Sequence, residues 1–190
     1  MPRPIRLIII HCSATPDERT LFAGRYWEPG FRTPVMEIDG WHKARGFERE
    51  PAWRKRQNPA LEAIGYHYVI ARNGACFSGR HEDEVGAHAQ GFNTPSLGVC
   101  LVGTSQYTPQ QWLQLKATVE GLAAHYNVPL ISPNITIQGR QKWVAHGGVC
   151  GHRELPDVAK TCPGFSVSDW LAGGLAPLPG HLSPAPEASA

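Results

Sequence analysis

Short apolar runs separated by polar, glycine-containing segments predict a buried β-sheet. Residues 5–10 are mostly β-branched and apolar, which is typical of a central strand covered on both faces. Residues 96–102 form a second run of this kind. Residues 65–71 predict a strand that returns over residues 75–78, because the intervening Asn73-Gly74 pair favours a tight hairpin turn. Ile135 and Ile137 indicate a further short strand, and Gly147-Gly148 indicates a turn.

Helical periodicity is clearest after Thr108. A hydroxyl at Thr108, proline at position 109 and glutamine at position 111 together predict a capped helix start. Apolar residues then recur every three or four positions, so this helix should pack on the sheet along one stripe. The stripe consists of Trp112, Leu115, Val119, Leu122 and Tyr126. Further helices are expected at residues 35–44 and 166–171.

These elements predict an α/β fold with a mixed central β-sheet flanked by helices, in a single domain over residues 1–172. The basic segment 45–58 should be a solvated insertion. Residues 173–190, rich in Gly, Pro, Ala and Ser, should form a disordered tail. Since side chains alternate along a strand, Tyr66 and Tyr68 should share one face of the sheet.

Composition excludes several classes of protein. The net charge of +2 gives no reason to expect a nucleic-acid partner, and we expect a monomer. Five cysteines, an odd number, argue against a disulfide framework, and the first apolar run is too short for a secretory signal. No apolar stretch approaches the roughly 20 residues of a membrane span. We therefore expect synthesis in a reducing cytoplasm.

The segment 151–164 concentrates the reactive residues of the chain. It holds His152, Lys160 and Cys162 among prolines and glycines, which indicates a loop. Imidazole nitrogen and thiolate sulfur are preferred zinc ligands. His11, at the end of the first predicted strand, is the best candidate for a third ligand. A hydrogen-bonded structural histidine remains the alternative for His11 on its own. Three protein ligands would leave one position of a tetrahedral zinc site for water.

Such a site suits attack on an amide or ester carbonyl, because zinc makes hydroxide available near neutral pH. Lys160 could supply positive charge to the developing oxyanion, and Tyr66 could supply a hydroxyl donor. Either group could also move a proton to the departing amine. A solvated loop lysine and a packing tyrosine remain the alternatives for these two residues.

Five motifs in this order resemble zinc-dependent N-acetylmuramoyl-L-alanine amidases of the phage lysozyme-like type, relatives of the peptidoglycan recognition proteins. The resemblance spans about residues 5–172. The motifs are Ile9-Ile10-His11-Cys12-Ser13-Ala14-Thr15, Gly65-Tyr66-His67-Tyr68, Gly86-Ala87-His88-Ala89, residues 93–103 (NTPSLGVCLVG), and Gly151-His152-Arg153-Glu154 through Lys160-Thr161-Cys162-Pro163.

The resemblance implies a zinc cleft on one side of the sheet that holds one Zn2+ per chain. It implies His11, His152 and Cys162 as ligands, with Tyr66 and Lys160 as catalytic groups. His88 and Asn93 match segments near the cleft, so we assign them to substrate contact. Segments 45–58 and 130–149 are longer than in compact phage members, which leaves substrate choice open.

The implied reaction is hydrolysis of the amide joining N-acetylmuramic acid to L-alanine in peptidoglycan. The leading hypothesis is a phage endolysin that reaches the cell wall with the help of a holin. Three alternatives are a cytoplasmic amidase that recycles soluble muropeptides, a non-catalytic peptidoglycan-binding module, and a cysteine hydrolase using Cys12 or Cys162. Some phage relatives also bind an RNA polymerase, for which the sequence offers no independent support.

Overall fold

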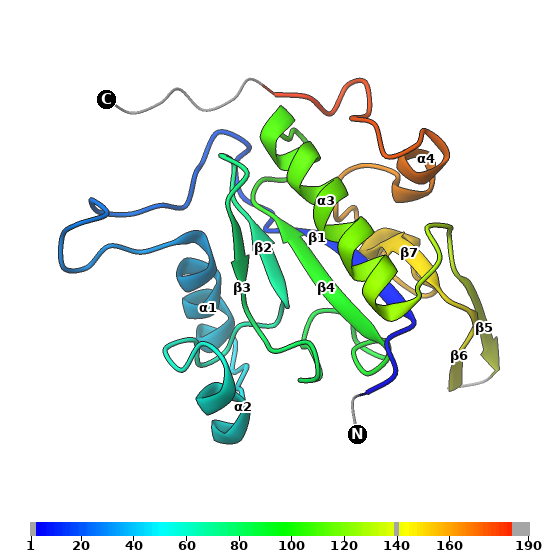
Figure 1. The fold of residues 1–190 in the computed structure, drawn as a ribbon, viewed down its shortest axis with the longest axis horizontal. Coiled ribbons are helices and arrows are strands. Elements are labelled where there is room, and N and C mark those ends of the chain that lie inside the picture. The colour runs from blue at the N-terminus through cyan, green and yellow to red at the C-terminus, as the bar shows by residue number, and fades with distance from the viewer. Residues whose placement is uncertain (1–2, 139–140, 184–190) are drawn as a thin grey trace.

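Five strands form the main sheet of the computed structural model, which describes residues 3–138 and 141–183 (Figure 1). Their order is β3-β2-β4-β1-β7. β1 pairs in parallel with β4 and β7, β2 pairs in parallel with β4, and β3 runs antiparallel to β2. The predicted mixed sheet is therefore confirmed. The bounds are β1 Leu7–Cys12, β2 Tyr68–Ile70, β3 Cys76–Ser78, β4 Ser96–Leu101 and β7 Gly148–Gly151.

One face of the sheet is covered by α3 (Pro109–Tyr126), as Figure 1 shows. Trp112, Leu115 and Val119 pack with Ile8 and Ile10 of β1 in the largest apolar cluster. The helix begins as predicted, with the Thr108 hydroxyl accepting from the backbone N–H of residue 111 and the side chain of residue 111 accepting from the Thr108 N–H. This reciprocal cap holds the helix start against the sheet.

The opposite face is covered in two parts. Ile38 of α1 (Pro34–Ala44) packs near Val69 and Cys100 of the sheet. Ala89 and Phe92, from the loop before β4, pack on Leu7 and Ile9 of β1. His11 follows Leu7 and Ile9 on alternate positions of β1, so it reaches the same face, where the cleft lies.

The basic segment 45–58 is solvated only in part. Its helix α2 (Pro51–Arg56) buries none of its residues, as expected. Arg49 is different, because its guanidinium forms a buried ion pair with Glu84, with 2.7 Å between Nη2 and Oε2. Three backbone carbonyls also accept from this guanidinium. The prediction of a solvated insertion is therefore wrong for Arg49, which ties this segment to the domain.

The stretch before β7 forms a separate two-stranded antiparallel sheet of β5 (Asn134–Gln138) and β6 (Gln141–His146). The expected strand around Ile135 and Ile137 is confirmed as β5, and Gly148 begins β7 rather than completing a turn. A short 3-10 turn, η1 (His152–Glu154), follows β7, and α4 (Val167–Ala172) closes the domain. Among the helices of residues 3–138 and 141–183, none has the length and apolar character needed to cross a bilayer.

Residues 173–183 pack against the domain, which differs from the predicted disordered tail. Leu175 is buried in the α3-side cluster. The backbone of Leu182 forms a β-bridge with Tyr107, and the carbonyl of His181 accepts from the indole N–H of Trp112. Contacts with α3 and Tyr107 therefore order a segment whose composition alone indicates disorder. The remainder of the predicted tail, residues 184–190, lies outside the described residues.

Tyr66 and Tyr68 lie on different sides of the sheet. Tyr68 packs against the cluster under α3, whereas Tyr66 packs with Val69 in the cluster under α1. The predicted alternation is wrong because β2 begins only at Tyr68, and strand geometry does not extend back to Tyr66. Tyr66 consequently reaches the same face as His11.

Candidate metal centre and cleft

The first candidate ligand, His11, is held by the middle of the sheet. β1 lies between β4 and β7, so both of its edges are paired, and His11 is opposite Cys100 of β4 in register. The imidazole is almost fully buried, and its Nε2 lies 3.0 Å from Nδ1 of His88. This contact orients the ring so that Nδ1 faces Cys162.

The other two candidate ligands come from residues 151–164, here called the metal loop. Glu154 anchors its beginning, since its carboxylate accepts from the N–H of Gly151 at 2.7 Å and from the N–H of Val167 at 2.7 Å. The loop also closes on itself, because the N–H of Arg153 donates to the carbonyl of Cys162 at 2.8 Å. His152 and Cys162 are thereby held at neighbouring positions.

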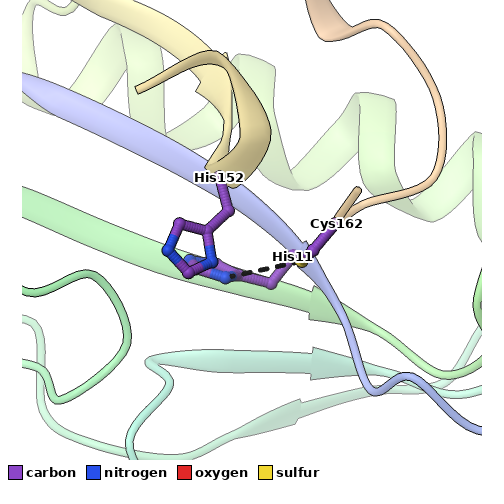
Figure 2. Close-up of side chains that lie close together, drawn as sticks. All are labelled: His11, His152 and Cys162. Atoms are coloured by element: carbon purple, nitrogen blue, oxygen red, sulfur yellow. Dashed lines mark hydrogen bonds between the residues drawn. The ribbon is translucent and has the colours of Figure 1, made fainter. Parts of the chain in front are cut away.

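His11, His152 and Cys162 converge, as Figure 2 shows. Their ligand atoms all lie within 4.8 Å of one another, and Sγ of Cys162 is 3.8 Å from Nδ1 of His11. Ligand atoms of a tetrahedral zinc site are roughly 3.4–3.8 Å apart, given bond lengths of about 2.0–2.3 Å. The group therefore fits a metal ion after a small contraction. Within residues 3–138 and 141–183 no fourth His, Cys, Asp or Glu joins it.

The electrostatics of the three residues suit a metal-binding site. Burial, followed by the nearby His152 and Lys160, holds the pKa of His11 well below its usual value. Burial and Lys160 also lower the pKa of His152. Both imidazoles are therefore neutral near pH 7, as ligation requires. The contact with the Cys12 thiol and burial raise the pKa of Cys162, so metal binding there must release a proton.

The two predicted catalytic side chains lie beside this group. The ring centroid of Tyr66 is 5.1 Å from that of His11. Burial, followed by the surrounding cysteines, raises the pKa of Tyr66, so its hydroxyl stays protonated and can donate a hydrogen bond. Lys160 is exposed and, together with His152, lines a cleft of about 760 Å³.

His88 and Asn93 also line the cleft, but their contacts are mainly within the protein. The side-chain oxygen of Asn93 accepts from the backbone N–H of His88 at 2.9 Å and of Ala89 at 2.8 Å. His88 in turn contacts His11. Both residues therefore shape the cleft wall beside the candidate metal centre. The sequence motifs alone could not separate this structural role from the predicted contact with substrate.

Three residues near the site were not predicted from the sequence. The ring centroid of His42, on α1, lies 5.3 Å from that of Tyr66. Its position one helical turn after Ile38 could have indicated that it faces the sheet. Glu154 anchors the metal loop, as described above. Lys142 of β6 lines the cleft from the two-stranded sheet, and no motif in the sequence indicates this placement.

The sequence matches the N-acetylmuramoyl-L-alanine amidase family over residues 1–165. The chain belongs to this family. The endolysin of Escherichia phage T7 is 31% identical over 171 residues, which cover 86% of this chain and 83% of that protein. A peptidoglycan-recognition protein of Drosophila melanogaster is 28% identical over 144 residues, covering 73% of this chain and 66% of the relative.

Solved structures agree with the fold of the amidase. The N-acetylmuramoyl-L-alanine amidase LysC from Clostridium intestinale matches with a TM-score of 0.60 and 23% identity, over 91% of this chain and 86% of that one. Drosophila PGRP-LB matches with a TM-score of 0.55 and 19% identity, over 96% and 85%. The predicted fold is thus confirmed, and the family match together with the T7 relative confirms the predicted N-acetylmuramoyl-L-alanine amidase activity. The amidase has a His–His–Cys group that could hold a metal ion.

Proposed function

We propose that this amidase is a zinc enzyme that hydrolyses the bond between N-acetylmuramic acid and L-alanine, and that it acts as an endolysin. The observation that carries the proposal is the convergence of His11, His152 and Cys162 within 4.8 Å. Two neutral imidazoles and one thiolate are a preferred zinc donor set, and three protein ligands are typical of catalytic rather than structural sites.

Zinc bound there would polarise the substrate carbonyl and lower the pKa of a water molecule to about 7. Side chains of the protein provide oxyanion stabilisation and proton transfer. The Lys160 ammonium, close enough to lower the pKa values of His11 and His152, stabilises negative charge that develops on the carbonyl oxygen. The protonated Tyr66 hydroxyl, beside His11, is a second donor for that oxygen. Lys160, which lines the cleft, also gives a proton to the leaving amine.

The endolysin role is supported by the T7 endolysin, which this chain matches over most of its length. The substrate would then be peptidoglycan of the intact wall, reached from the cytoplasm after release by a holin, and the enzyme would act as a monomer. A recycling amidase would share the chemistry but would act on soluble muropeptides. Lysis of intact sacculi separates these two roles.

Metal analysis combined with mass spectrometry of digested peptidoglycan tests the proposal. We expect one zinc per chain, and products with a free L-alanine amine. A chelator should abolish the activity and added zinc should restore it. Cys162→Ser should bind zinc weakly and lose most turnover, whereas Cys76→Ser, at an exposed cysteine, should behave as wild type. Full activity of metal-free Cys162→Ser protein would overturn the zinc assignment.

A further inference from the structure

The two-stranded sheet of β5 and β6 reaches the cleft through one side chain. Of its described residues, Lys142 alone lines the cleft. Gly91 and Asn93 from the loop before β4, and Asp157 from the metal loop, line the same cleft. The small sheet therefore adds a lysine to a cleft that the main sheet and the metal loop already form.

Packing holds Lys142 in place. Ile135 and Val144 of the small sheet pack against the apolar cluster that contains Phe92. The Lys142 ammonium lies 4.8 Å from the centroid of the Phe92 ring, an arrangement in which the ring face attracts a cation. The aliphatic part of Lys142 runs along Gly91, where its Cδ would be 3.3 Å from an added Cβ. These contacts hold the positive charge of Lys142 beside the Phe92 ring.

The charge of Lys142 is incompletely compensated. Its Nζ is 3.9 Å from the nearer Asp157 oxygen, which is beyond hydrogen-bond distance, and the Asp157 side chain is 66% exposed. Because the carboxylate is largely solvated and makes no hydrogen bond to Lys142, this pair contributes little free energy. Among the described residues, the charged side chains that line the cleft are Lys142, Lys160 and Asp157, which together carry a net positive charge. Lys160 is near the metal ligands, whereas Lys142 is beside Phe92 and Gly91.

We propose that Lys142 binds a carboxylate of the stem peptide, and that the amidase therefore prefers peptides with free carboxylates to peptides in which these groups are amidated. The inference rests on the proposed function, because the proposed function puts the scissile amide at the metal centre and the stem peptide along the cleft. The Lys142 ammonium makes no hydrogen bond to any described residue and lies beside the Phe92 ring, so its donors suit a carboxylate partner.

The test uses soluble N-acetylmuramoyl tripeptides in two forms, with their carboxylates free or converted to carboxamides. For wild type we expect kcat/KM about tenfold higher with the free acid. Lys142→Met, which retains an unbranched stem on Phe92, should lose about tenfold with the free acid, mainly through KM. Its kcat/KM with the amidated form should stay within twofold. Lys142→Arg should keep the preference, and so should Lys55→Met, which removes an exposed lysine of α2.

Kinetic results that differ from these expectations would overturn the inference. An equal loss with both substrates would mean that Lys142 only anchors the small sheet. A preference that persists in Lys142→Met would place carboxylate recognition elsewhere. These results leave the proposed function intact, because wild type still cleaves both peptides. Failure of zinc-loaded wild type to cleave either peptide or intact sacculi would remove the proposed function, and the inference with it.

Discussion

Nε2 of His11 lies 3.0 Å from Nδ1 of His88, while Nδ1 of the same His11 ring faces Cys162. When Nδ1 of His11 binds a metal ion, Nε2 carries the proton and donates to His88. Burial holds the pKa of His88 well below its usual value, so His88 is neutral and can accept. Contacts of this kind fix the orientation of a metal-binding histidine. His88 is thus a positioning residue for a candidate ligand.

Replacement of His88 should therefore weaken zinc binding. We expect His88→Ala to lose roughly 10- to 100-fold in zinc affinity, measured by competition with a chromogenic chelator. At saturating zinc, KM should change little, because the substitution acts on His11. His125→Ala, at an exposed position of α3, is the control and should bind zinc as wild type does. Normal zinc affinity together with a raised KM would instead return His88 to substrate contact.

Removal of the Lys160 ammonium should separate metal binding from turnover. Lys160 is exposed and provides no ligand atom, so Lys160→Ala should keep its zinc. Loss of a charge that stabilises the developing oxyanion should lower kcat by about 100-fold. Metal content by mass spectrometry and steady-state kinetics provide the two readouts. An unchanged kcat would exclude Lys160 from the mechanism.

Leu175 should stabilise the domain although it lies in the segment expected to be disordered. Its side chain is 7% exposed and belongs to the apolar cluster under α3. Leu175→Ala should therefore lower the free energy of unfolding by about 2–4 kcal/mol, measured by urea denaturation. Leu182→Ala removes a side chain that is 48% exposed and should cost about 0.5 kcal/mol or less. Equal effects of the two substitutions would contradict the packing described for residues 173–183.

Acid should destabilise the fold partly through His67. Burial lowers the pKa of His67 to about 3, and its Nδ1 accepts from the N–H of Gly98 at 3.0 Å. The folded pKa is below the unfolded value of about 6.5, so this contribution is fully present above pH 6.5 and is lost as the pH falls toward 3. In that window the slope from His67 should approach about 1.4 kcal/mol per pH unit.

The slope can be assigned by comparing wild type with His67→Asn in the presence of a chelator. The asparagine oxygen can replace Nδ1 as acceptor for Gly98 but does not titrate. Urea denaturation at several pH values between 4 and 7 should give a shallower pH dependence for the variant. Identical slopes would mean that His67 does not titrate in this way.

The sequence predicts those features that depend on local pattern. The apolar run of residues 5–10 and the cap at Thr108 lead directly to β1 and α3, because burial and hydrogen bonding favour one local structure there. His11, His152 and Cys162 were identifiable because a metal site requires particular residue types. The structure brings these three together.

Other features depend on nonlocal contacts and could not be predicted in this way. The buried pairing of Arg49 with Glu84 needs two segments to meet, although each alone indicates exposure. The packing of Leu175 depends on the apolar cluster that α3 and the sheet form together. Similarly, the side of the sheet reached by Tyr66 depends on where β2 begins, and a strand boundary is poorly defined by an alternating pattern.

The separation of His11 from Cys162 by 151 positions constrains when this enzyme can begin to work. In a chain still emerging from the ribosome, His11 is present long before Cys162, so the His–His–Cys group cannot form until Cys162 has been made. If the proposed zinc mechanism is correct, truncated translation products that end before Cys162 therefore have no hydrolytic activity.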